Sequence, residues 1–199
     1  TIAIESNTLN YYNFYNKNIL ESQVTILRNA TCLNNIKMLN NLQELFILML
    51  SDTINRGDLP ESVHTLNFGL YSQTTSANVL PLTLKNLVFG VNYNIKIDTN
   101  TLPSGLQTLE FGHEYNQDIS VGVLPLNLRR LKFGYQYNKE ILYGVLPDNL
   151  LILEFGDMFN KDIGGEILPI NLQELIFGFS FNQIINAGVL PPKLNNLVF

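Results

Sequence analysis

Few residues of the chain have the types and spacing that catalysis or metal binding requires. His64 and His113 lie far apart in the sequence, and neither has further zinc ligands at the usual spacing beside it. The glycines lack the Lys and the Ser or Thr of a phosphate-binding loop. Glu110 and Glu154 are isolated carboxylates, which we interpret as surface charges rather than as a general acid and base. The sequence therefore predicts no enzyme, no metal site and no cofactor.

Composition narrows the class of protein further. The chain is 46% hydrophobic and 15% charged, with a formal net charge of -5 at pH 7, and it has no basic stripe for nucleic acid. It has neither an apolar run of the roughly 20 residues that a membrane helix needs nor a secretory signal peptide. The single Cys32 cannot form an internal disulfide, and we interpret it as a buried small hydrophobe. We expect a cytoplasmic globular protein without nucleic-acid or membrane partners.

The sequence that would have to position any site is built from one repeat, and we call its regular spacing of landmark residues the frame. Leu-Pro pairs recur in steps of 22 residues after a first step of 21. They begin at Leu59, Leu80, Leu102, Leu124, Leu146, Leu168 and Leu190. Phe-Gly pairs keep the same spacing from Phe68 to Phe177, and Phe199 ends the chain where the next pair would begin. The frame separates residues 1–58 from residues 59–199, which hold six complete repeats and a truncated seventh.

Each repeat is predicted to form one coil of a solenoid. The alternation Leu-x-Phe, as in Leu131 and Phe133, has the period of a short strand with one buried face. The Gly that follows, such as Gly134, predicts either a positive φ or a close approach of two backbones. Pro after Leu excludes a continuing helix and favours an extended lead-in to the strand. We therefore predict a leucine-rich-repeat-like solenoid, with a parallel β-sheet on one face, short extended or irregular returns and little helix.

An asparagine follows an aromatic residue in every regular coil. These residues are Asn94, Asn116, Asn138, Asn160 and Asn182. A single Asn in a turn is usually satisfied by its own backbone. Because this one recurs beside core aromatics, we favour a structural ladder in which each side chain bonds the backbone of an adjacent coil. Independent exposed turns are the alternative.

The repeat Leu-Pro-x-x-Leu-x-x-Leu-x-Phe-Gly-x-x-Phe-Asn-x-x-Ile-x-x-Gly-x-Leu-Pro resembles the FNIP repeat, a relative of leucine-rich repeats found in social amoebae and in giant viruses of amoebae. The resemblance covers Leu59 to Phe199. The family often has Pro before the Ile, whereas this chain has Lys96, Asp118, Glu140, Asp162 and Ile184 there. The resemblance implies a protein-binding scaffold and, where an F-box precedes the repeats, substrate capture for a ubiquitin ligase.

Residues 1–58 are interpreted as degenerate repeats or a cap. Residues 38–48, "MLNNLQELFIL", align with residues 168–178, "LPINLQELIFG". The segment "FYNKNI" at 14–19 echoes "MFNKDI" at 158–163, with Leu9 and Tyr11 in place of the strand residues. An irregular join is expected from Val24 to Lys37, and a helix over residues 33–50 is the alternative. No F-box is visible in this sequence.

The variable positions of the strands form the candidate partner surface, because function in a solenoid usually lies on the exposed face of its sheet. Glu110, Lys132 and Glu154 alternate in sign on adjacent coils, which predicts a cross-strand ladder or, alternatively, a mutually neutralised surface. Apolar residues gather near the C-terminal end, where a contact site or a covering chain would explain them. The candidate partner-binding residues are Arg130, Lys132, Ile152, Ile176, Phe179 and Val198.

The last predicted strand, residues 194–199, has no following coil to cover it, and an uncapped edge is a template for another chain. We therefore expect a homodimer through this edge beside an unidentified protein partner. The leading hypothesis is a non-catalytic protein-recognition scaffold, which is a substrate adaptor for ubiquitination if joined to an F-box. The second is a structural or assembly protein that self-associates through its ends. The chain begins without Met and ends inside a repeat, so we expect a piece of a longer or processed protein.

Overall fold

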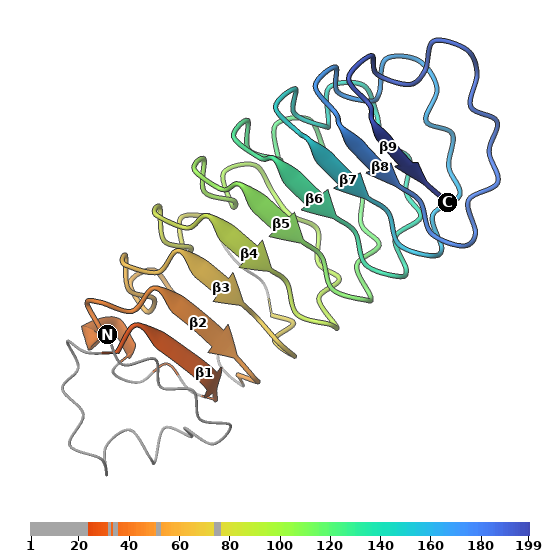
Figure 1. Ribbon diagram of the computed structural model, residues 1–199. Coiled ribbons are helices and arrows are strands. Elements are labelled where there is room, and N and C mark those ends of the chain that lie inside the picture. The colour runs from red at the N-terminus through yellow and green to blue at the C-terminus, as the bar shows by residue number, and fades with distance from the viewer. Residues whose placement is uncertain (1–23, 32, 34–35, 51–52, 74–76) are drawn as a thin grey trace.

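The computed structural model describes residues 24–199 except residues 32, 34–35, 51–52 and 74–76. Within these residues, nine parallel strands lie side by side in the order of the chain and form one sheet (Figure 1). The strands are β1 (Ile26–Ala30), β2 (Glu44–Ile47), β3 (Thr65–Asn67), β4 (Asn86–Val88), β5 (Thr108–Glu110), β6 (Arg130–Lys132), β7 (Ile152–Glu154), β8 (Glu174–Ile176) and β9 (Asn196–Val198). The described residues contain one helical element, the 3-10 helix η2 (Ile36–Met38), and no helix long and apolar enough to cross a membrane. The predicted repeat solenoid is confirmed.

The middle residue of each three-residue strand, from β3 to β9, is a leucine that faces the core, and Leu45 takes the same place in β2. From β2 to β9 these leucines pair in register, for example Leu109 with Leu131 and Leu131 with Leu153. The residues on either side of each leucine point to the opposite face, because successive side chains of a strand alternate. They are half-buried from β3 to β8. One face of the sheet therefore packs against the core. The other face, which carries the residues on either side of each leucine, is partly exposed to solvent, and we call it the open face.

Two columns of aromatic rings run through the core alongside the leucines. The first column holds the Phe of each Phe-Gly pair, and the rings of Phe111 and Phe133 in it lie 5.5 Å apart. The second column holds the aromatic residue before each ladder Asn, and the rings of Tyr115 and Tyr137 in it lie 6.1 Å apart. Within one coil the columns touch, since Phe133 and Tyr137 stack at 3.8 Å. Neighbouring coils therefore share one continuous core, which is where a solenoid gains its stability.

Two tyrosines of the second column bury polar atoms without a partner. The hydroxyls of Tyr115 and Tyr137 make no hydrogen bond, and burial, as the largest cause, raises the pKa of both phenols. The hydroxyl of Tyr71, by contrast, accepts a hydrogen bond from the backbone N–H of Ile54 at 3.1 Å. A later coil places Phe159 at this position, where its ring stacks equally well. The column thus requires an aromatic ring and not a hydroxyl.

The glycine after each strand is required by the close approach of neighbouring coils. A Cβ atom on Gly134 would overlap the carbonyl oxygen of Gly112, and one on Gly156 would overlap that of Gly134. None of these three glycines has a positive φ. Of the two predicted reasons for glycine at this position, close approach is confirmed and positive φ is wrong for the regular coils. Gly69, in the shorter repeat, combines the close approach with a φ of 49°.

Two ladders of asparagine side chains join the coils outside the sheet. In the first, the Oδ1 atom of each Asn accepts the backbone N–H of the Asn one coil later, at 2.9 or 3.0 Å, along the series Asn94, Asn116, Asn138, Asn160 and Asn182. The inner members are half-buried, and the first and last are exposed. The second ladder was not predicted. In it, the Nδ2 atoms of Asn127, Asn149 and Asn171 donate to backbone carbonyls of the preceding coil at 2.9 Å.

The described N-terminal residues extend the same sheet. Strand β2 pairs in register with β3, so that Leu45 lies beside Leu66, and the alternative of a helix over residues 33–50 is wrong. Strand β1 occupies part of the segment where an irregular join was expected, so that expectation is corrected as well. Its register against β2 shifts between Leu27 and Ala30, where Asn29 has a φ of 56°. The predicted echoes of the repeat at residues 9–19 lie outside the described residues.

Candidate functional site

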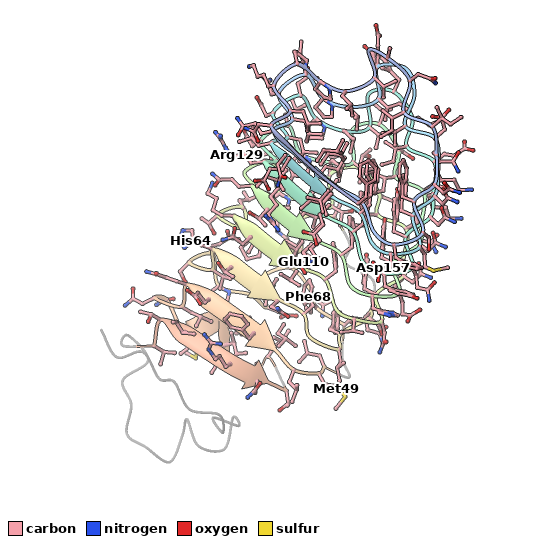
Figure 2. All side chains as sticks on the ribbon, turned by 45° about the vertical axis from the view of Figure 1, so that its right-hand side comes forward. Met49, His64, Phe68, Glu110, Arg129 and Asp157 are labelled. Atoms are coloured by element: carbon pink, nitrogen blue, oxygen red, sulfur yellow. The ribbon has the colours of Figure 1, made fainter. Side chains whose placement is uncertain are left out.

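The open face of the sheet carries two columns of variable side chains. One column stands before the strand leucines and includes Arg130, and the other stands after them and includes Lys132. Figure 2 shows Arg129 at the edge where the chain enters the strands and Asp157 at the other edge, beyond the arrowheads. The side chains between these two edges belong to different coils but share one surface, because the strands pair in register.

Glu154 is the centre of a charge network on this face. The Nζ atom of Lys132 lies 2.8 Å from one carboxylate oxygen of Glu154 and 3.9 Å from Glu110. Arg130 donates to the other oxygen of Glu154 at 3.2 Å. The charges that alternate along the sequence thus form ion pairs between neighbouring strands. Because these side chains are partly exposed, each pair is worth only about 0–1 kcal/mol, and the network orients charges more than it stabilises the fold.

A groove of about 400 Å³ crosses the ends of four strands beside this network. One wall is the column from Val88 to Glu154, and the other is the row of residues that follow the strand glycines, from Val91 to Asp157. The Phe-Gly segments, including Gly134, connect the two walls. The groove therefore runs along the solenoid axis, and each coil contributes one residue to each wall.

The second wall carries two ring side chains and one carboxylate after Val91. The rings of His113 and Tyr135 stack with their centroids 4.8 Å apart and an interplanar angle of 4°. Nδ1 of His113 lies 2.6 Å from Oε1 of Glu114. Asp157 occupies the same position in the next coil, and Phe179 follows in the coil after that. Tyr135 is 41% exposed, and Phe179, just beyond the wall, is 95% exposed, so both rings are accessible to solvent.

The predicted apolar cluster has two separate parts. Ile176 and Val198 pair in register on β8 and β9. Phe179 lies on the turn that follows β8. Ile152 stands in the other column, where its partner on β8 is Glu174 and not Ile176. The structure therefore places three of the predicted apolar residues near the C-terminal edge and sets Ile152 apart from them.

Of the residues that follow the strand glycines, only Phe179 was predicted as a site residue, and the residues of the second wall were not. His113, Tyr135 and Asp157 occupy the position after the strand glycine, where the residue type changes from coil to coil. Only their position in the repeat could have identified them, because the residue that follows the strand glycine lies at the same edge of the sheet in every coil. The arrangement offers ion pairs and ring faces, which suit recognition of side chains. Among the described residues, no group of three or more His, Cys, Asp or Glu side chains is placed to hold a metal ion.

Comparisons with known proteins agree with this architecture. The family model described as FNIP Repeat matches residues 71–114, 115–158 and 159–199. A crystal structure of CroV588, a giant-virus protein described as a novel circular LRR protein structure, is 43% identical over 79% of this chain, with a TM-score of 0.77. The matched region covers 24% of that protein, so this chain spans about a quarter of its length. No curated protein matches the chain.

Proposed function

The chain belongs to the FNIP repeat family, and from this membership we propose that it is a non-catalytic scaffold that binds a protein partner across the open face of its sheet. The groove supports this proposal most directly, because its walls present variable charged and aromatic side chains on a repeated frame. Solenoids build extended binding surfaces in this way, with a constant core and variable exposed columns.

A more specific role follows from the family resemblance. The repeats would act as a substrate adaptor for ubiquitination when they are joined to an F-box, with the groove holding the protein to be modified. The proposal places the scaffold in the cytoplasm, or in the host cytoplasm if the chain is viral. Its support is the resemblance of the repeats and not a contact in the structure.

Affinity capture from the native cell tests binding through the sheet face. Lys132→Glu reverses the charge of the lysine that lies between Glu110 and Glu154, and Lys96→Glu makes the same change at an exposed lysine on the return segment. We expect a set of proteins that Lys96→Glu retains and Lys132→Glu loses by about tenfold or more. Equal capture by the wild-type chain and both variants would contradict the scaffold proposal. Ubiquitin-ligase components among the proteins that depend on Lys132 would support the adaptor role, and their absence would remove it.

A structural or assembly protein is the second candidate, and the C-terminal edge favours it. The ring of Phe199 stacks on Phe177 at 5.6 Å and is still 69% exposed. Strand β9 has a neighbour on one side only among the described residues. A strand edge of this kind is a template for another chain, and a second copy in a two-fold dimer is its simplest occupant.

Sedimentation over a wide range of protein concentration tests this second candidate. Val198→Lys combined with Ile176→Lys should reduce association and leave the N-terminal coils folded, because interactions in a repeat array act mainly between neighbours. A wild-type chain that stays monomeric at every concentration would remove the candidate. A dimer that tolerates both charges would remove it as well.

A further inference from the structure

We propose that the end of the second wall binds an arginine side chain of the partner protein, at Asp157 between the ring of Tyr135 and the ring of Phe179, which lies one coil beyond the groove. This inference rests on the proposed function, because it names the chemistry by which a partner would be recognised on the sheet face. It assigns a role to a carboxylate and two exposed rings that the ion-pair network leaves unused.

The three side chains stand one coil apart on the same edge of the solenoid. The backbone N–H of Met158 donates to the carbonyl of Tyr135 at 3.0 Å, and the N–H of Ser180 donates to the carbonyl of Asp157 at 2.8 Å. One coil earlier in this column, the rings of His113 and Tyr135 are 4.8 Å apart. With the same spacing between the later coils, a cation paired with the carboxylate would lie within the roughly 6 Å over which a ring face attracts it.

The carboxylate of Asp157 is also the unpaired charge of this part of the groove. Glu154, on the opposite wall, is neutralised by Lys132 and Arg130. Asp157 makes no ion pair and no side-chain hydrogen bond with any residue in the described part of the chain. The net charge of -5 favours approach of a cationic segment as well, since complementary charge speeds association and selects partners.

Arginine fits this position better than lysine does. Its planar guanidinium can pair with a carboxylate and stack on an aromatic ring at the same time, whereas the lysine ammonium is a hydrated point charge. The chain makes such a contact itself, because the guanidinium carbon of Arg28 lies 4.5 Å from the ring centroid of Phe46. The residue at one end of the groove, Val88, is apolar. Ile176, which lies one strand beyond the opposite end, is apolar as well. We therefore expect the arginine in an extended segment with apolar residues on either side.

A display library of short random peptides, selected on the wild-type chain, tests the inference. We expect the selected peptides to share an arginine flanked by apolar residues. Replacing that arginine by citrulline, which has the same shape but no charge, should weaken binding by about tenfold or more, and lysine should restore only part of the loss. Asp157→Asn should cost about tenfold, equivalent to about 1.4 kcal/mol, and Phe179→Ala several-fold.

The control variant is Asp148→Asn, which removes an exposed carboxylate on the turn before β7 and should leave peptide binding unchanged. Three results would overturn the inference: a library without binders, binders without a recurrent arginine, or an arginine peptide that binds Asp157→Asn as tightly as the wild-type chain. The scaffold proposal is judged separately by the Lys132→Glu capture. The scaffold proposal fails if the Lys132→Glu variant captures the same proteins as the wild-type chain, whatever result the peptide library gives.

Discussion

The Oδ1 atom of Asn138 accepts a hydrogen bond from the backbone N–H of Asn160, one coil later, at 3.0 Å. The N–H of Asn138 donates in turn to Oδ1 of Asn116 at 3.0 Å. Each inner asparagine is therefore an acceptor toward one neighbouring coil and a donor toward the other. Removing one of these side chains interrupts the series at a single interface between coils.

Asn138→Ala is expected to lower the free energy of unfolding by about 1 kcal/mol, because it leaves the N–H of Asn160 without its acceptor. The shift of the urea midpoint measures this loss. Gln136→Ala is the control, since Gln136 lies on the same turn and its side chain makes no hydrogen bond to a described residue. Equal midpoint shifts for the two variants would show that the ladder does not contribute to stability.

Gly134→Ala is expected to lower the free energy of unfolding by about 3 kcal/mol, because the added methyl group would overlap the backbone of the preceding coil. The matched control is Gly105→Ala, where the nearest atom to a new Cβ is the mobile end of the Lys85 side chain. Thermal and urea unfolding of both variants give the comparison. If the two substitutions cost the same, the coils do not approach each other as the structure shows.

Tyr137→Phe is expected to leave stability unchanged or to raise it by about 1 kcal/mol, because it removes a buried hydroxyl that has no partner. Tyr71→Phe should have the opposite effect and cost about 1 kcal/mol, since it deprives the N–H of Ile54 of its acceptor. Urea midpoints of the two variants are compared with that of the wild-type chain. A clear loss of stability in Tyr137→Phe would mean that its hydroxyl is hydrogen-bonded in solution.

Stability is expected to fall as the pH rises above about 10, the ordinary pKa of tyrosine. Burial raises the pKa values of Tyr115 and Tyr137 in the folded chain, so the unfolded chain releases protons that the folded chain retains. The stability is therefore complete below pH about 10 and is lost at higher pH. Unfolding midpoints between neutral and strongly alkaline pH measure the slope.

The variant Tyr115→Phe with Tyr137→Phe should lose part of this alkaline slope, because neither phenylalanine can ionise. Tyr143→Phe is the control, since the side chain of Tyr143 is exposed, and it should keep the wild-type profile. A double variant whose midpoint falls with pH as steeply as that of the wild-type chain would assign the alkaline loss to other groups.

The regular coils could be predicted because each landmark residue has one physical role. Leu131 and Phe133 alternate with outward positions, and Gly134 leaves no room for a side chain. Strand β1 could not be predicted in the same way. Its register shifts after Leu27, and this shift removes the regular spacing by which the other strands were found.

The candidate site could be predicted only in part. Lys132 and Glu154 lie on strands, where alternation determines which face a side chain occupies, and their pairing followed from the register. Tyr135 and Asp157 lie on turns after the strands, where no periodicity indicates the direction of a side chain. The second asparagine ladder was missed for a related reason, because an Asn such as Asn149 in the turn after a Leu-Pro pair resembles any other turn residue.

Equivalent rings of the regular coils lie farther apart than neighbouring strands of a parallel sheet do. Strands of a parallel sheet lie about 4.8 Å apart, whereas Phe111 and Phe133 are separated by 5.5 Å and Tyr115 and Tyr137 by 6.1 Å. Each coil is thus thinner at the sheet than at the aromatic columns, and a stack of such coils curves toward the sheet. We infer that the sheet lines the concave side of this curve, so that a narrow or convex partner would fit the groove best.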